Sequence, residues 1–367
     1  MSPRMTGDCR LSTADCSGSS QRRVVHLPVY KDNAYQPMLM EAQRKLGWEV
    51  IDGGGGGNFL KTALRQWTPD ILHLHWLHPY LLRDGAMASW MRGLRFLAEI
   101  VLIRRAGAKI VWTLHNFVNH DQRHAAIELA LTRRFVRHCD LILVHGSYAE
   151  KFGRGQLAIP ASTPVITVRH PNYCSAKQQG ATSLVKEKES NDGMLVGFLG
   201  RIEPYKQVVE LVQAFRSIAS ESDQLRICGR AGEAYAGEVN LAIAGDQRIL
   251  FRDQYVLQND IEEWMSGVDI VACPSRGILT SGSVILAMSF GRPVLAPSDG
   301  CIPEEVGDTG FLYDNSEPDG LRRGLKQAFD QRSRLLALGE RALARAREAS
   351  PELVARQIVS AYESILK

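Results

Sequence analysis

The sequence predicts an α/β protein with two doubly wound domains, each built on a parallel sheet, that face each other across a cleft. From Arg23 onward, short apolar segments of strand length alternate with longer segments of helical pattern. This alternation occurs on both sides of segment 175–192, whose Lys, Gln, Glu and Ser residues are typical of a linker. The chain has 367 residues, more than one ordinary hydrophobic core requires, so we expect two domains.

The composition is that of a globular protein and argues against several other classes. The net charge of +4 is too small to indicate nucleic-acid binding. No apolar run approaches the ~20 residues of a membrane span, and the seven cysteines form no C-x-x-C pair. Residues 1–22 lack the apolar core of a secretory signal and predict a disordered leader. We therefore expect a cytoplasmic protein, or one bound peripherally to the inner face of the plasma membrane.

In the N-terminal half, 23–174, apolar runs and helical patterns follow one another in regular order. The predicted strands are 24–29, 48–51, 71–76, 109–114, 141–145 and 165–168. The predicted helices are 35–46, 94–105 and 125–138. Strands separated by helices form parallel sheets with both faces covered, so this half predicts one doubly wound domain.

The C-terminal half, 193–349, repeats the scheme. Its predicted strands are 194–199, 225–228, 249–252, 270–273 and 293–296, and its predicted helices are 208–219, 260–266, 283–290 and 321–329. The pattern of 333–367 is helical with one break, where Ser350 suits the N-cap and Pro351 the first position of a new helix. We expect this last helix, 350–367, to cross back to the N-terminal domain.

Two segments of the C-terminal half predict a phosphate site. Thr280, Ser281 and Gly282 form a turn of small residues directly before an apolar helix. Such a turn leaves backbone N–H groups free at the positive end of the helix dipole, which favours a phosphate. A plain N-cap is the alternative reading of the same residues.

The second segment supplies cations after a predicted strand. Gly200, Arg201 and Lys206 follow the first strand of this half, and Gly229 and Arg230 follow the next one. Because ligands bind where parallel strands end, we expect Arg201 and Lys206 to neutralise a diphosphate, and Gly229 and Arg230 to face the nucleotide. The alternative is a solvated loop that carries two charges.

These residues also resemble a known family. Gly200, Arg201 and Lys206 match the G-R-x-x-x-x-K signature of family-4-like GT-B glycosyltransferases, and SFGRPVLAP matches their A-x-G-x-P-V-V-A block. The segments NAYQPMLMEAQRKLGWEV, ILHLHWLHPYLL and IVWTLHNFVNHD resemble the acceptor domain of bacterial exopolysaccharide enzymes. The nearest likeness is to the xanthan-type β-mannosyltransferases, and it covers nearly the whole chain after Arg22.

The resemblance implies a GT-B fold with two Rossmann-like domains and a hexosyl transfer. The donor is expected to be a GDP- or UDP-linked sugar of the mannose or glucose type. The acceptor is expected to be a lipid-linked oligosaccharide or another glycan, in exopolysaccharide or cell-surface glycan synthesis. No cofactor or metal is required if Arg201, Lys206 and a helix N-terminus stabilise the leaving diphosphate.

One departure from the family favours inversion of the transferred sugar. Retaining family-4 enzymes carry two glutamates eight residues apart before the A-x-G-x-P block, and the matching positions here are Ile278 and Leu286. Neither side chain can accept a hydrogen bond from a sugar hydroxyl. The inverting β-mannosyltransferase-like branch shares this departure.

An inverting transfer needs a base for the acceptor hydroxyl. Three candidates follow the predicted strand 109–114 in one loop, namely Asp121, His120 and His115. Resemblance to inverting GT-B enzymes favours the carboxylate of Asp121. In retaining relatives, a histidine at the His115 position touches the donor sugar, so binding is the alternative role for His115.

The segment LHLHWLHPY raises the question of a metal. His73 and His75 point to the same face of a predicted strand, with His78 beyond its end. Zinc needs a further ligand that the sequence does not suggest, so structural or cleft-lining histidines are expected and no metal site.

The segment 92–137 is basic, and its helical part 90–105 is largely apolar. A core helix with basic residues toward solvent is one interpretation. The other is a surface that binds an anionic leaflet and presents the cleft to a lipid-linked acceptor.

Other functions remain open on the same architecture. A non-hydrolysing nucleotide-sugar epimerase would need paired acid and base groups around the donor sugar, which the C-terminal motifs do not supply. A non-catalytic nucleotide-sugar-binding protein would need no such groups.

Overall fold

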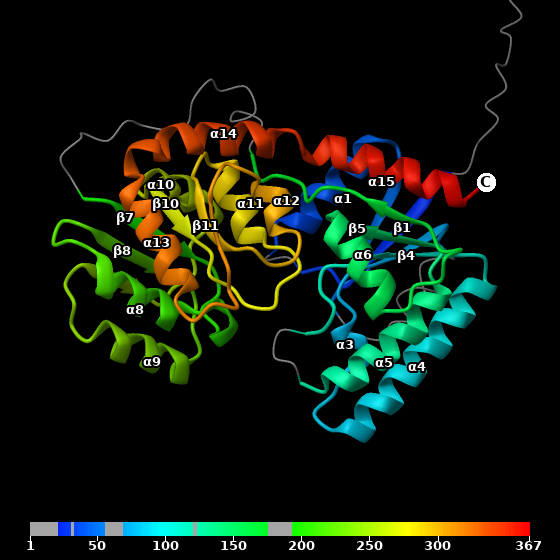
Figure 1. The fold of residues 1–367 in the computed structure, drawn as a ribbon. Coiled ribbons are helices and arrows are strands. Elements are labelled where there is room, and N and C mark those ends of the chain that lie inside the picture. Colours follow the sequence, from blue (N-terminus) through cyan, green and yellow to red (C-terminus); the bar gives the residue numbers. More distant parts are fainter. Residues whose placement is uncertain (1–20, 31–32, 56–68, 120–122, 175–192) are drawn as a thin grey trace, which may run out of the picture.

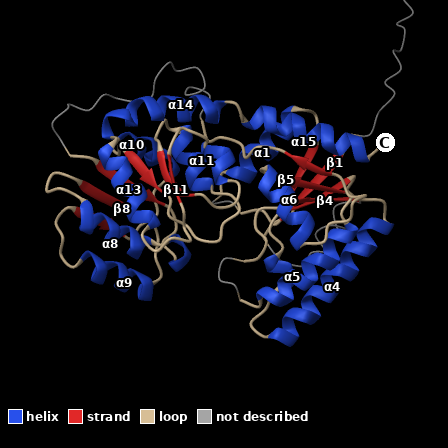
Figure 2. Cartoon of the chain, in the orientation of Figure 1, coloured by secondary structure: helices blue, strands red, loops and turns tan. Residues whose placement is uncertain are grey.

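The structure is a computed structural model. It describes residues 21–30, 33–55, 69–119, 123–174 and 193–367. Within them lie two parallel six-stranded sheets covered by helices (Figures 1 and 2). This arrangement confirms the predicted fold class. Most of the predicted leader, the predicted linker, His120 and Asp121 lie outside the described residues.

The N-terminal sheet has the strand order β2-β1-β3-β4-β5-β6, with every neighbouring pair parallel. Its strands are β1 (Arg23–Leu27), β2 (Glu49–Asp52), β3 (Ile71–Leu74), β4 (Lys109–Thr113), β5 (Leu141–Val144) and β6 (Val165–Thr167). Its helices are α1 (Tyr35–Lys45), α3 (His78–Leu81), α4 (Ala86–Arg105), α5 (Ala125–Phe135) and α6 (Ser147–Gln156). Leu72 and Leu74 pack in one core and Ile71 in another, so both faces of the sheet are buried. Continuous apolar runs form such strands because neither face meets water.

The C-terminal sheet has the order β12-β11-β10-β7-β8-β9. Its strands are β7 (Leu195–Leu199), β8 (Gln224–Cys228), β9 (Ile249–Arg252), β10 (Ile270–Ala272), β11 (Val294–Pro297) and β12 (Phe311–Tyr313). Its helices are α8 (Val208–Ile218), α9 (Glu233–Ile243), α10 (Ile261–Ser266), α11 (Gly282–Ser289), α12 (Ile302–Val306), α13 (Gly320–Asp330) and α14 (Leu335–Arg347). In both sheets the strand order reverses beside the first strand, so the strand ends on either side open a crevice.

The sequence pattern did not predict every helix and strand. Helices α3, α6, α9 and α12 and strand β12 were not predicted, and α4 begins well before the predicted start at Leu94. Helix α9 buries one side chain per turn, namely Tyr235, Val239 and Ile243, and leaves Leu241 80% exposed. An apolar residue on the solvent face obscures the 3.6-residue period.

The last helix, α15 (Pro351–Ile365), leaves the C-terminal sheet and packs on the N-terminal one, beside α1 (Figure 1). Ser350 caps it, since its hydroxyl oxygen accepts a hydrogen bond from the Leu353 N–H at 3.2 Å. Tyr362 of α15 is fully buried in the core that contains β1 and α1. The N-terminal domain is therefore completed by the end of the chain.

A second contact joins the two halves near the cleft. The carboxylate of Glu304, in α12, accepts hydrogen bonds from the Ser147 and Tyr148 N–H groups at 2.7 and 2.8 Å. These donors are the free N–H groups of the first turn of α6, where a negative charge is favoured. No helix in the described ranges is long and apolar enough to cross a membrane.

Candidate active site

A cleft of about 170 Å³ lies where the carboxyl ends of the two sheets meet. Loops after the strands of both halves supply its walls. The N-terminal half contributes Asn33, Tyr35, Trp76, His115, Asn116, His170 and Tyr173. The C-terminal half contributes Tyr205, Lys206, Ile278, Thr280, Ser281 and Gly282. The cleft thus brings one predicted catalytic residue, His115, together with four predicted donor-site residues, Lys206, Thr280, Ser281 and Gly282.

Lys206 is the cation of this cleft. It ends a short 3₁₀ turn, Pro204–Lys206, directly after β7, and its ammonium lies 5.2 Å from the centre of the Tyr205 ring. No carboxylate of the described chain lies within ion-pair distance of it, and burial lowers its pKa. A half-buried cation without a counter-ion favours an anionic ligand.

Arg201 lies outside the lining of the cleft. Its side chain is 80% exposed and pairs with Glu203 at 3.2 Å. An exposed pair of this kind contributes little to stability, so the guanidinium is free to reorient. The charge of Arg201 contributes to the lowered pKa of Lys206, so the two cations are neighbours, and their shared role at one diphosphate stays a prediction.

The N-terminus of α11 faces the cleft through Thr280, Ser281 and Gly282. Ser281 is the N-cap, because its hydroxyl oxygen accepts a hydrogen bond from the Val284 N–H at 3.4 Å. Gly282 is the first helical residue, and a Cβ there would lie 3.2 Å from the Tyr173 hydroxyl oxygen. The cap interpretation is therefore confirmed for Ser281, and the phosphate role of these residues stays a prediction.

The other two predicted glycines, Gly200 and Gly229, allow close backbone contacts next to the N-terminus of α11. A Cβ on Gly229 would lie 1.7 Å from the Gly200 carbonyl oxygen, so the loops after β7 and β8 touch only because Gly229 lacks a side chain. A Cβ on Gly200 would lie 3.4 Å from the hydroxyl oxygen of Ser283 in α11. Arg230 is exposed, and neither it nor Gly229 lines the cleft.

His115 follows β4 and is 5% exposed. Its ring stacks on that of Trp76, with centroids 4.4 Å apart. Burial, together with the neighbouring histidines, lowers the pKa of His115 well below its usual range, so the ring is neutral at pH 7. A neutral ring can accept a proton or a hydrogen bond.

The other two catalytic candidates, His120 and Asp121, lie outside the described residues, which include their neighbours Asn119 and Arg123. Glu128, in α5, accepts hydrogen bonds from the Asn119 N–H and side-chain amide at 2.8 and 2.6 Å. The Arg123 N–H donates to the Asn119 side chain at 3.2 Å. The ends of the loop are therefore held together next to helix α5.

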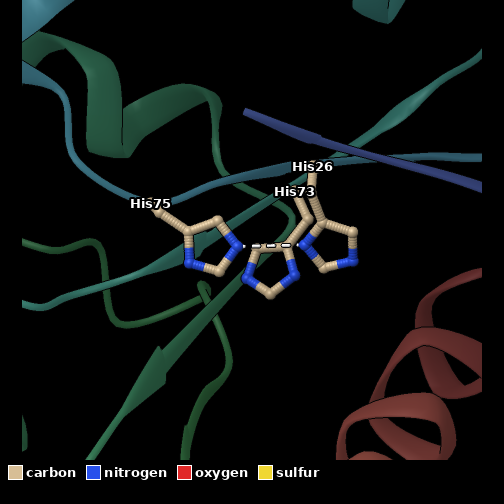
Figure 3. A group of neighbouring side chains, drawn as sticks. All are labelled: His26, His73 and His75. Carbon is tan, nitrogen blue, oxygen red and sulfur yellow. Dashed lines mark hydrogen bonds between the residues drawn. The ribbon is translucent and has the colours of Figure 1, made fainter. Parts of the chain in front are cut away.

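The histidine segment is part of a larger buried group. Ring nitrogens of His26, His73 and His75 lie within 4.8 Å of one another (Figure 3), a spacing that a metal ion could use. Every ring nitrogen of the three already has a hydrogen-bond partner in the protein. His78 instead begins α3. The arrangement favours neutral, hydrogen-bonded histidines over a metal centre.

Several cleft residues were missed by the sequence analysis. Asn33, His170, Tyr173 and Tyr205 each lie in a loop after a predicted strand, and that position was their only signal. Ile278 lines the cleft and Leu286 is half-buried against a core. Among the described residues that line the cleft there is no carboxylate.

Comparisons with known proteins decide the family. Residues 193–331 match the family model for glycosyl transferases group 1. The chain is 31% identical over 270 residues to the GDP-mannose:glycolipid 4-beta-D-mannosyltransferase of Xanthomonas campestris pv. campestris, which covers 70% of this chain and 70% of that protein. The chain belongs to the group 1 glycosyltransferases.

Other proteins are similar to this glycosyltransferase as well. The D-inositol 3-phosphate glycosyltransferase of Corynebacterium efficiens is 29% identical over 179 residues, 46% of this chain and 42% of that protein. The structure resembles the sucrose-phosphate synthase of Thermosynechococcus elongatus with a TM-score of 0.72 at 15% identity, over 94% of this chain and 99% of that one. It also resembles Anabaena HepE, solved with UDP and glucose, with a TM-score of 0.68 at 15% identity, over 94% and 100%. The glycosyltransferase therefore has the GT-B fold, as the resemblance implied.

Proposed function

We propose that this glycosyltransferase moves a mannosyl residue from GDP-mannose to a lipid-linked oligosaccharide, with inversion and without a metal, in the synthesis of an exopolysaccharide or cell-surface glycan. The observation that carries the proposal is the cleft itself. Its donor side offers an unpaired half-buried cation, Lys206, and the N-terminus of α11, and its lining contains no carboxylate within the described residues.

The diphosphate binds between these two groups. Lys206 neutralises the charge that develops as the nucleoside diphosphate leaves, and the N–H groups of Ser281 and Gly282 donate hydrogen bonds to the phosphate oxygens. Magnesium would need oxygen ligands, and carboxylates are the ones it prefers. Their absence from the described lining supports stabilisation by the protein alone. Arg201 joins the site only if its exposed side chain reorients.

The name of the Xanthomonas campestris relative supports the donor and the acceptor class. That protein is a GDP-mannose:glycolipid 4-beta-D-mannosyltransferase, and the chain spans 70% of it. HepE, solved with UDP and glucose, supports a nucleotide-sugar donor more generally. Inversion is supported by Ile278 and Leu286, which cannot hold the donor sugar as the glutamates of retaining enzymes do.

The test is a transfer assay with GDP-mannose, UDP-glucose and UDP-galactose as alternative donors, a lipid-linked oligosaccharide acceptor, and EDTA present or absent. We expect transfer from GDP-mannose alone, at the same rate with EDTA. Transfer only from a UDP sugar, or loss of activity in EDTA, would contradict the proposal. Conversion of the donor without an acceptor would indicate an epimerase, and binding without any turnover a non-catalytic protein.

We also propose that α4 and α5 dock on an anionic leaflet. One face of α4 packs on the core through Phe96, Leu97, Ile100 and Ile103. Along the opposite side runs an apolar stripe, Met87, Met91, Leu94 and Leu102, whose exposed fractions are 73, 61, 53 and 49%. Exposed arginines lie on α4, on α5 and in the 3₁₀ turn after α5, namely Arg95, Arg105, Arg133, Arg134 and Arg137.

This surface combines the two features of interfacial helices. Apolar side chains at helical spacing enter the headgroup region, and arginines attract anionic lipid. The core interpretation of segment 90–105 therefore holds for one face of α4, and the leaflet interpretation is our proposal for the other. A lipid-linked acceptor would reach the cleft from the same membrane.

Sedimentation with vesicles tests this surface. In vesicles with one-third phosphatidylglycerol, we expect the double variant Met91→Glu/Leu94→Glu to bind at least about tenfold less than the wild type. Each substitution removes apolar area that would enter the membrane and adds a negative charge that the anionic lipid repels. Leu241→Glu is the matched control, since Leu241 is 80% exposed on α9 of the other half. Equal binding of all three proteins would contradict docking through α4.

A further inference from the structure

Six buried histidines form a row across the carboxyl edge of the N-terminal sheet. They come from β1, from β3 and its end, and from the loops after β4, β5 and β6. In strand order they are His26, His73, His75, His115, His145 and His170. Only His115 and His170 of this row line the cleft, so the others act, if at all, through their neighbours.

Three of these rings are linked to Gln43 of α1 in one continuous chain. His26 Nε2 lies 2.7 Å from the Gln43 Oε1, and His26 Nδ1 lies 3.0 Å from His75 Nε2, the contact drawn in Figure 3. His75 Nδ1 then lies 3.1 Å from His115 Nε2. The chain thus runs from the first helix to the wall of the cleft.

With the Gln43 amide oriented as in the structure, every hydrogen bond in the chain has a single direction. The Gln43 side-chain N–H donates to the Tyr362 hydroxyl at 3.2 Å, which leaves its Oε1 toward His26. An amide oxygen only accepts, so His26 carries its proton on Nε2 and accepts at Nδ1. By the same logic His75 donates from Nε2, and so does His115.

We propose that Gln43, His26 and His75 are positioning residues that hold His115 in its Nε2–H tautomer and leave Nδ1 as an acceptor for a sugar hydroxyl in the cleft. This inference rests on the proposed function for the identity of the ligand, but not for the tautomer. His115 Nδ1 has no hydrogen-bond partner within the described part of the chain. The Trp76 ring, stacked at an interplanar angle of 15°, holds the plane of the imidazole.

The opposite arrangement is disfavoured by simple hydrogen-bond rules. If His115 carried its proton on Nδ1, its Nε2 lone pair would face His75, and His75 and His26 would have to reverse as well. His26 Nε2 and the Gln43 oxygen would then present two lone pairs to each other at 2.7 Å unless the Gln43 amide turned over, which would also reverse the hydrogen bonds of Tyr362 and His73. Charging a ring is also disfavoured, since burial lowers the pKa of His26 to about 4 and that of His75 well below its usual range.

The remaining histidines of the row provide an internal reference. His145 and His170 direct Nδ1 at backbone carbonyl oxygens, of Val168 at 2.9 Å and of Pro171 at 2.8 Å. A carbonyl only accepts, so these two rings are Nδ1–H tautomers. The structure thus assigns opposite tautomers to two groups of histidines in one sheet.

Long-range ¹H–¹⁵N correlation of the ¹⁵N-histidine-labelled protein at pH 7 distinguishes these forms directly. We expect neutral Nε2–H patterns for His26, His75 and His115, and Nδ1–H patterns for His145 and His170. An Nδ1–H or charged His115 would overturn the inference, even in a protein that transfers mannose. The expected pattern in a protein without transferase activity would sustain the tautomer and refute the proposed function instead.

Variants test the consequence for the sugar. Gln43→Met removes the terminal acceptor, so we expect mixed tautomers at His115 and a loss of about 3- to 10-fold in donor kcat/KM, the effect of one weakened neutral hydrogen bond. Affinity for GDP, which lacks the sugar, should not change. Thr113→Val is the matched control, because Thr113 is buried and its partners, His73 at 2.7 Å and the Tyr35 hydroxyl, lie outside the chain. An unchanged His115 spectrum in Gln43→Met, or equal effects of both variants, would overturn the positioning role.

Discussion

Lys206→Ala is expected to lower kcat/KM for the nucleotide-sugar donor by about 10²–10³-fold, the usual effect of removing one group that stabilises developing negative charge. Lys206 is the cation of the cleft and has no carboxylate partner within the described residues. Its interaction with the diphosphate strengthens as the bond to the sugar breaks. Most of the loss should therefore appear in kcat, measured in steady-state transfer assays.

The control is Lys326→Ala in the same half of the protein. Lys326 is exposed on α13 and pairs with Asp330 at 2.8 Å, so its loss should leave the kinetics unchanged. Folding of both variants is checked by thermal denaturation. If Lys206→Ala folds and keeps wild-type kinetics, the diphosphate does not bind at Lys206.

Asp121→Asn is expected to reduce kcat by about 10²–10⁴-fold while nucleotide binding persists, because general-base catalysis contributes an effect of this size. The change keeps the size of the side chain but removes the basic oxygen. The flanking residues Asn119 and Arg123 are held next to Glu128, at the loop that follows the strand of His115. Single-turnover transfer and GDP titration separate the two effects.

The alternatives for the base are tested in parallel. If Asp121→Asn stays within a few-fold of the wild type and His120→Ala or His115→Ala is inactive, the base is a histidine. The tautomer assigned to His115 leaves its Nδ1 able to take that role. A loss of donor affinity in His115→Ala, with kcat preserved, would instead assign His115 to sugar binding.

The sequence was sufficient to predict the regular parts of the fold. Strands such as β3 and β5 are buried on both faces and read as apolar runs, and the break at Pro351 separates α14 from α15 as predicted. The missed elements are those whose pattern is weak. Helix α6 contains Gly153 and Gly155, which lower helix propensity, and β12 has only three residues.

The candidate site likewise contains residues that local sequence patterns predict and contacts that they do not. Lys206, Ser281 and Gly282 were predicted because each belongs to a local pattern of strand, turn and helix. Gln43 of α1 contacts His26 of β1, and it also bonds to Tyr362 of α15, near the other end of the chain. No local pattern encodes such contacts. The exposure of Arg201 and its pairing with Glu203 are likewise not revealed by spacing alone.

The measurement that tests the central claim most directly is the configuration of the sugar linkage in the product of the GDP-mannose reaction. GDP-mannose carries its mannose in the α configuration. We predict a β linkage, read from the one-bond C–H coupling at the anomeric carbon by NMR, in product formed in the presence of EDTA. An α-linked mannosyl product would contradict an inverting enzyme whose cleft lacks the glutamates of the retaining branch.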